Sequence, residues 1–221
     1  MRFPAGLCLC GMLIAALAVG LHAQDKASLF KEGKDTTGDG KEDTWTYLNN
    51  QGKIELIESD NNADGVVDKW RRFTAEGVRV KTESDENFDG KLDTWIIFNE
   101  AGDKIRVEKD TNNDEKIDQW QHFDPASGDL TKAEIDSKGK GIDQTVFYLP
   151  GGQKDRMESD SDGDGKVDRW ISYYPNGKMK EVGYDTDKSG KPNVWQRYNE
   201  DGSKGQAGFD TDGDGKPDKW Q

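Results

Sequence analysis

Aspartates alternate with other residues in a short acidic segment that recurs along this chain. One copy runs Asp-Ser-Asp-Gly-Asp-Gly-Lys-Val-Asp from Asp160 to Asp168. Carboxylates at alternate positions converge only if the chain turns sharply, and Gly165 permits such a turn. Cations of the size of Ca²⁺ take about six to eight oxygen ligands, so the pattern predicts a calcium-type loop. An ordinary Asp/Gly turn is the alternative, which near-copies elsewhere in the chain disfavour.

Eight such loops are present, and we number the positions of each from its first aspartate. Side chains at positions 1, 3, 5 and 9 and a backbone carbonyl at position 7 are the predicted ligands. The loops begin at residues 35, 60, 85, 110, 136, 160, 185 and 210. The sixth and eighth loops have the fullest sets, which are Asp160, Asp162, Asp164, Lys166 and Asp168, and Asp210, Asp212, Asp214, Lys216 and Asp218.

The remaining loops depart from this pattern. In the second to fourth loops the predicted ligands are Asp60, Asn62, Asp64 and Asp68; Asp85, Asn87, Asp89 and Asp93; and Asp110, Asn112, Asp114 and Asp118. Weaker sets occur in the first loop (Asp35, Asp39 and Asp43) and the seventh (Asp185, Asp187, Ser189 and Asn193). Glu115 replaces the position-6 glycine of the fourth loop and should strain its turn. The fifth loop is one residue short, and we expect it to be empty, which leaves up to seven Ca²⁺ ions.

The loop pattern resembles the β-hairpin calcium loops of bacterial FG-GAP, VCBS and integrin-type repeats, and more distantly those of thrombospondin type 3 repeats and EF-hands. An EF-hand requires a bidentate acid at position 12, where this chain has residues such as Thr46 and Gln121, so the helical form is excluded. Separately, the segment from Tyr173 to Lys178 resembles MORN-type hairpins. These resemblances imply an exported bacterial calcium-binding repeat protein.

The loops belong to a repeat of about 25 residues that determines the predicted fold. Tryptophan follows the first aspartate by ten residues in every copy except the fifth, which has Thr145, and a turn glycine such as Gly52 comes seven or so residues later. The segments between them are short and β-branched, as in strands. Residues 35–221 therefore form eight hairpins, and we expect an all-β, elongated antiparallel meander of sixteen strands with the metal loops along one edge. A closed barrel or propeller is the competing architecture.

Other residue types limit the classes of function that this protein can have. The tryptophans serve either to pack the sheet or, as an exposed ladder, to bind carbohydrate or cell wall. Glu58 and its equivalents just before each loop either line a solvated strand face or add a ligand. A lone His122 and the absence of any cysteine after residue 23 provide no catalytic group, so we expect no enzyme.

The N-terminus has the features of a secretory signal over residues 1–23, with residues 24–34 as a lead-in strand. We therefore expect a secreted protein, periplasmic, at the cell surface or extracellular, without a membrane span. Removing Arg2 with the signal lowers the net charge from −13 to −14, which disfavours nucleic acid as a partner. The eighth copy stops at Trp220 and Gln221, so its open edge is either a short frayed strand protected by charged side chains or a docking edge for a protein partner or a second copy.

Overall fold

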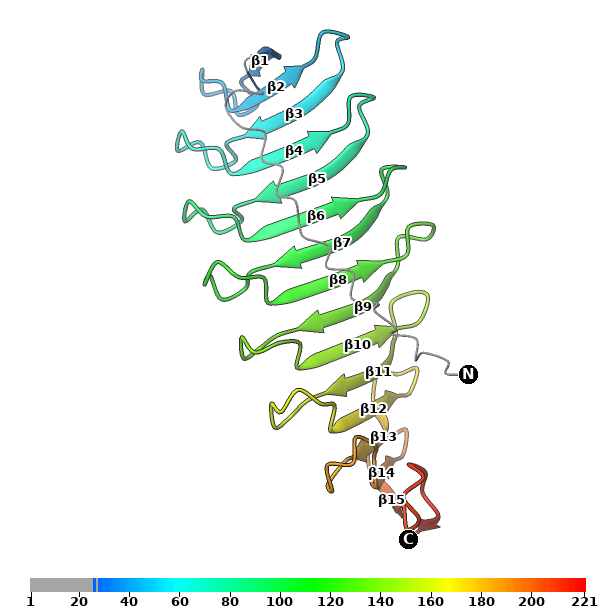
Figure 1. Ribbon diagram of the computed structural model, residues 1–221. Coiled ribbons are helices and arrows are strands. Elements are labelled where there is room, and N and C mark those ends of the chain that lie inside the picture. The colour runs from blue at the N-terminus through cyan, green and yellow to red at the C-terminus, as the bar shows by residue number, and fades with distance from the viewer. Residues whose placement is uncertain (1–25, 27) are drawn as a thin grey trace, which may run out of the picture.

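The protein forms one open sheet of sixteen antiparallel strands that follow one another in chain order (Figure 1). The computed structural model describes Lys26 and residues 28–221, so the predicted signal segment lies outside the described residues. The predicted meander is confirmed, and the sheet does not close into a barrel. The strands are β1 (Phe30–Lys34), β2 (Thr44–Leu48), β3 (Ile54–Ser59), β4 (Lys69–Phe73), β5 (Arg79–Ser84), β6 (Thr94–Phe98), β7 (Lys104–Lys109), β8 (Gln119–Phe123), β9 (Leu130–Ile135), β10 (Gln144–Tyr148), β11 (Lys154–Ser159), β12 (Arg169–Tyr173), β13 (Met179–Tyr184), β14 (Val194–Tyr198), β15 (Lys204–Phe209) and β16 (Lys219–Trp220).

Tight glycine turns connect each even-numbered strand to the next along one edge of the sheet. In the β2–β3 turn, the Gly52 N–H donates to the Asn49 carbonyl at 2.9 Å, and the Asn49 side chain accepts from the Lys53 N–H at 3.0 Å. Gly52 has φ of 73°, a left-handed conformation that glycine adopts without a steric penalty. The predicted role of the turn glycines is therefore confirmed.

The aspartate loops lie along the opposite edge, stacked from β1 to β16 (Figure 1). Successive loops are joined by a backbone hydrogen bond from the position-1 N–H of one loop to the carbonyl of the last residue of the loop before it. Examples are Asp60 to Asp43 at 2.8 Å and Asp185 to Asp168 at 2.9 Å. Seven such bonds link all eight loops, and we call them the loop spine. The backbone of each loop is thus hydrogen-bonded directly to that of the next.

A row of alternating tryptophan and glutamate crosses one face of the sheet. Glu58 on β3 pairs with Trp45 on β2 and with Trp70 on β4, and the same alternation continues to Glu134 on β9. At β13 and β15 the glutamate position is held by glycine, Gly183 and Gly208. Because paired residues share a face, tryptophan and glutamate side chains lie side by side along the sheet.

The glutamates of this row are paired and half-buried or buried, so the expectation of a solvated face was wrong for Glu58 and Glu83. Glu58 and Glu83 are 5% and 8% exposed. Arg72 and Lys81 contact Glu83 at 2.6 and 2.7 Å. Burial alone would raise the pKa of Glu83, but these two ion pairs hold it below its usual value. This face is therefore a charge-paired packing layer.

Two further side chains complete this face. Burial and a 2.7 Å hydrogen bond to Glu58 raise the pKa of Tyr47 to about 12. His122, which sequence reasoning treated as a lone surface residue, contacts Glu134 at 2.6 Å and takes part in the same layer. On the opposite face the apolar side chains of Val107, Val146 and Val182 are buried.

In the described part of the chain, no helix has the length and apolar character needed to cross a membrane.

Candidate metal-binding loops

Each loop is closed by side-chain oxygens of its first and last residues, which are aspartates except for Asn193 at the end of the seventh loop. In the sixth loop, the N–H groups of Gly163 and Gly165 donate to the two oxygens of Asp160 at 2.6 and 2.7 Å. At the other end, Asp168 accepts from the Ser161 N–H at 3.0 Å. Short loops leave many backbone amides without strand partners, and these two carboxylates satisfy several of them. The loop shape is therefore encoded by positions 1 and 9.

Two residues per loop adopt a left-handed backbone, at positions 4 and 6. Sequence reasoning predicted this for position 6 only, and Glu115 does have φ of 67° there. Position 4 was missed because it is often not glycine, as in Ala63, Phe88, Asn113 and Lys188, which have φ of 60–61°. The signal was present in the Gly-x-Gly spacing of the sixth and eighth loops, which have glycine at both positions.

Two loops gather three carboxylates closely enough to hold a metal ion. Across Lys26 and residues 28–221, the two groups are Asp160, Asp162 and Asp168 in the sixth loop, and Asp210, Asp212 and Asp218 in the eighth. Within each group, one oxygen from each carboxylate lies within 4.8 Å of the others. Ligands about 2.4 Å from one Ca²⁺ lie at most about twice that far apart, so the spacing fits a shared ion. We call these groups the sixth and eighth triads.

The amide hydrogen bonds do not prevent metal binding at the triads. A carboxylate offers about four lone-pair sites, and Asp160 uses only some of them on the loop amides. The amides also fix the orientation of the carboxylate, which lowers the cost of ordering it around an ion. The two triads belong to the loops that the sequence ranks first.

The position-5 aspartates, predicted as ligands, are not members of either triad. Asp164 accepts from the Lys166 N–H at 2.9 Å, and Asp214 accepts from the Lys216 N–H at 2.8 Å. Each position-5 carboxylate thus holds the position-7 N–H, where the loop leads back into the next strand. The structure thus brings together positions 1, 3 and 9 and leaves position 5 to one side.

The other loops keep the hydrogen bonds from loop amides to the first and last residues, which we call the frame, but they have fewer acids at positions 3 and 5. In the second loop, Asn62 at position 3 accepts from the Asp64 N–H at 3.0 Å and donates to the Asp64 carboxylate at 2.9 Å. In the first loop, Asp39 accepts from the Lys41 N–H, and the Thr37 hydroxyl donates to Asp35 at 3.4 Å. The other predicted ligands occupy the same loop positions in their copies. These are Asp43, Asp60, Asp68, Asp85, Asn87, Asp89, Asp93, Asp110, Asn112, Asp114, Asp118, Asp185, Asp187, Ser189 and Asn193.

The fifth loop shows the frame without inner acids. Asp136 accepts from the N–H groups of Lys140 and Gly141 at 3.0 and 3.1 Å, and Asp143 accepts from the Ser137 N–H at 2.9 Å. Lys138 points to the sixth loop, where its ammonium contacts the Ser161 carbonyl at 3.2 Å. A loop can therefore fold in this register with only its first and last aspartates.

Hydrogen bonding lowers the pKa of two carboxylates of the eighth triad. The N–H and hydroxyl of Thr211 hold the pKa of Asp218 below its usual range. Desolvation opposes ionisation at Asp210, but amides led by that of Gly215 outweigh it and lower its pKa. In the sixth triad, the Lys188 ammonium lowers the pKa of Asp162. Negatively charged oxygens are therefore presented at neutral pH, as a cation requires.

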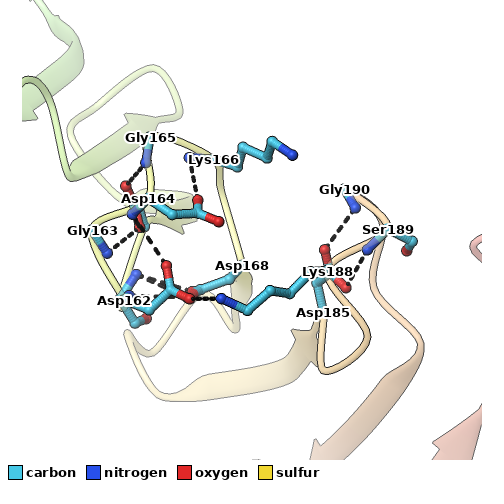
Figure 2. A network of polar contacts seen from close by, with 12 residues as sticks. Asp162, Gly163, Asp164, Gly165, Lys166, Asp168, Asp185, Lys188, Ser189 and Gly190 are labelled. Carbon is cyan, nitrogen blue, oxygen red and sulfur yellow. Dashed lines mark hydrogen bonds and ion pairs between the residues drawn. The ribbon is translucent and has the colours of Figure 1, made fainter.

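A lysine from the seventh loop reaches into the sixth triad. Figure 2 shows the Lys188 ammonium against the Asp162 carboxylate, with Nζ and Oδ2 2.7 Å apart. Lys191 of the same loop contacts the Asp214 carbonyl of the eighth loop at 3.4 Å, an oxygen outside the triad. The two triads therefore differ in whether a neighbouring ammonium contacts a triad carboxylate.

The tryptophan face has a shallow hollow of about 140 Å³ between β11 and β14. Glu158, Trp170, Ser172, Glu181 and Trp195 line it, above the Gly183 that replaces a glutamate of the row. Trp195 is itself only 6% exposed. The hollow is thus a polar and aromatic surface feature distinct from the loops.

No protein-family model matches this sequence, and no curated protein matches it either.

Proposed function

We propose that this protein is an exported, noncatalytic calcium-binding repeat protein that acts as a metal-stiffened scaffold or adhesion module. The observation that carries the proposal is the sixth triad, with oxygens of Asp160, Asp162 and Asp168 within 4.8 Å of one another, repeated in the eighth loop. We assign it to the bacterial proteins with Asp-x-Asp-x-Asp-Gly-x-x-Asp repeats, on the loop pattern described above.

Ligand chemistry favours calcium over other divalent ions. The triads offer carboxylate oxygens and no imidazole or thiolate, which disfavours zinc and copper. Magnesium demands near-ideal octahedral geometry and keeps several waters, whereas calcium accepts irregular sets of oxygens. Loops that present acids at variable positions therefore suit calcium. Extracellular calcium modules bind with dissociation constants of about 10⁻⁴–10⁻³ M, which matches the proposed location outside the cell.

The position of the loops supports the scaffold role. All eight are stacked on one edge and joined by the loop spine, so an ion in one loop stiffens the contact with the next (Figure 1). The described sheet is one layer with few fully buried apolar side chains. Its stability therefore depends more than usual on neutralising the acidic edge. Seven Ca²⁺ ions in this array would carry +14, which would offset the net charge of −14 that remains without residues 1–23.

The test is a calcium titration of the protein without residues 1–23, followed by circular dichroism, tryptophan fluorescence and calorimetry. We expect the urea midpoint of the strand signal to fall in excess chelator and to recover in millimolar calcium, with binding heat for more than one ion. Matched titration with magnesium provides the control for ionic strength. A urea midpoint that is the same in chelator and in calcium, together with no heat of calcium binding, would contradict the proposal.

The hollow between Trp170 and Trp195 supports a second candidate, a carbohydrate-binding or cell-wall-binding module. Indole faces stack on sugar rings, and Glu158 and Glu181 provide acceptors for hydroxyl groups. The low exposure of Trp195 favours packing, so we rank this function second. Retention of the protein on insoluble polysaccharide, lost in a folded Trp170→Ala variant, would promote it above the scaffold.

A further inference from the structure

The sixth triad shares one of its carboxylates with a lysine of the next repeat. Asp162 occupies position 3 of the triad, and the Lys188 ammonium lies 2.7 Å from its Oδ2 (Figure 2). Lys188 is at position 4 of the seventh loop, where the sixth and eighth loops have glycine. Its φ of 61° is the left-handed conformation that disfavours residues other than glycine. A lysine therefore stands at a position where the backbone would prefer glycine.

The eighth triad provides the comparison within the same molecule. In the described part of the chain, no lysine or arginine forms an ion pair with Asp210, Asp212 or Asp218. The first, third and ninth positions are aspartate in both loops, and both have glycine at positions 4 and 6. The ammonium on a triad carboxylate is thus a difference between two otherwise similar sites.

We propose that Lys188 is a tethered counter-ion of the sixth loop, which a divalent cation must displace in order to bind the sixth triad. The inference rests on the proposed function, since it concerns the regulation of a calcium loop. This competition lowers the calcium affinity of the sixth loop. When calcium binds there, the contact between Lys188 of the seventh loop and Asp162 is broken. The eighth triad binds without such a step.

Charge and flexibility make the displacement feasible. Lysine is a point charge on a flexible four-carbon stem, and the Lys188 side chain is 68% exposed, against 43% for Asp162. The ammonium can move into water without leaving a buried charge behind. An ion pair this exposed is weak, so we expect it to reduce calcium affinity by about twofold to fivefold.

Site-resolved NMR of the full chain without residues 1–23 tests the proposal, because the Gly165 and Gly215 amides report the sixth and eighth loops separately. In a calcium titration of Lys188→Met, the midpoint for Gly165 should fall by about twofold to fivefold, while that for Gly215 stays unchanged. Lys180→Met, which removes an equal charge from an exposed position on β13, should shift neither midpoint. Lys188→Gly is a second variant that also relieves the left-handed backbone and should give the same shift.

The outcomes separate this inference from the proposed function. If Gly165 responds to calcium with the same midpoint in the parent protein, in Lys188→Met and in Lys188→Gly, the tethered counter-ion is overturned and the calcium function stands. If neither Gly165 nor Gly215 responds up to about 10 mM calcium, ten times the weak end of the expected range, both proposals fall.

Discussion

The fifth and sixth loops are neighbours that share a frame and differ in its contents. Both begin with an aspartate that accepts loop amides, and both end with one that accepts amides from the start of the loop. The spine joins them through the Asp160 N–H and the Asp143 carbonyl at 2.9 Å. Inside the frame, however, the fifth loop has lysines where the sixth has Asp162 and Asp164.

This difference distinguishes two roles of the acidic residues, which are shaping the loop and supplying charge at the metal site. Because the fifth loop keeps its shape without inner acids, the first and last aspartates are architectural whether or not a metal binds. The position-3 aspartates, by contrast, contribute mainly to the charge at the site. A substitution at position 9 and one at position 3 should therefore have different consequences.

The largest effect is expected where the frame is most buried, at Asp68 of the second loop. Asp68 is 2% exposed and accepts from the N–H groups of Asn61 and Asn62 at 2.7 and 3.3 Å. Asp68→Ala leaves these amides without that acceptor and should lower the free energy of unfolding by about 2–4 kcal/mol. Urea denaturation in chelator measures this without any metal contribution. A loss smaller than that from Asp162→Asn would refute the architectural role.

The next effect concerns binding instead of folding. Asp162→Asn and Asp212→Asn keep an oxygen acceptor at position 3 and remove its charge, so each should weaken one calcium site by at least about tenfold. In chelator, the free energy of unfolding should change by less than about 0.5 kcal/mol. Calorimetry gives the number of sites lost. The reverse change, Asn62→Asp in the second loop, should tighten calcium binding there.

A site can also be built into the fifth loop. Lys138→Asp and Lys140→Asp, with one residue inserted after Gly141, reproduce the acids and the length of the sixth loop. We expect one additional calcium and, at about ten times its dissociation constant, a gain of about 1.4 kcal/mol in the free energy of unfolding. The two substitutions without the insertion are the control. Equal calcium binding by both variants would show that loop length is not what disables the fifth copy.

The smallest effect is the response to acid. The folded pKa values of Asp43, Asp210 and Asp218 lie below the usual 3.8, so these groups stabilise the fold above that pH, and the contribution is lost as pH falls toward their folded pKa values. In chelator, the free energy of unfolding should therefore decline as the pH drops below about 4. Asp218→Asn should make the decline shallower. An unchanged slope in that variant would mean that other carboxylates, such as Glu83, carry the dependence.

Much of the architecture is predictable because the repeat carries local information. The spacing of Asp160, Trp170 and Gly177 sets loop, strand and turn lengths, and a meander follows when every copy agrees. The ranking of the loops likewise depends only on which side chains occupy each position. The first and last aspartates were predicted as ligands, but their amide contacts, which the fifth loop isolates, were not.

Other features depend on cross-strand register and on side-chain direction, which no local pattern specifies. Glu58 pairs with tryptophans from two different repeats, and its burial follows from that register. The contact between Lys188 and Asp162 depends on how two stacked loops face each other. The left-handed backbone of Phe88 is imposed by the amides on either side, against its own preference.

The loop spine makes the two long edges of the molecule mechanically unequal. Backbone hydrogen bonds tie every loop to the next, whereas the turn edge is linked between repeats by scattered side-chain contacts, such as the Tyr174 hydroxyl to the Tyr198 carbonyl at 3.0 Å. Tension along the long axis would therefore meet greater resistance at the loop edge than at the turn edge. Under load the sheet should bend so that the turns move apart while the loop edge acts as the hinge.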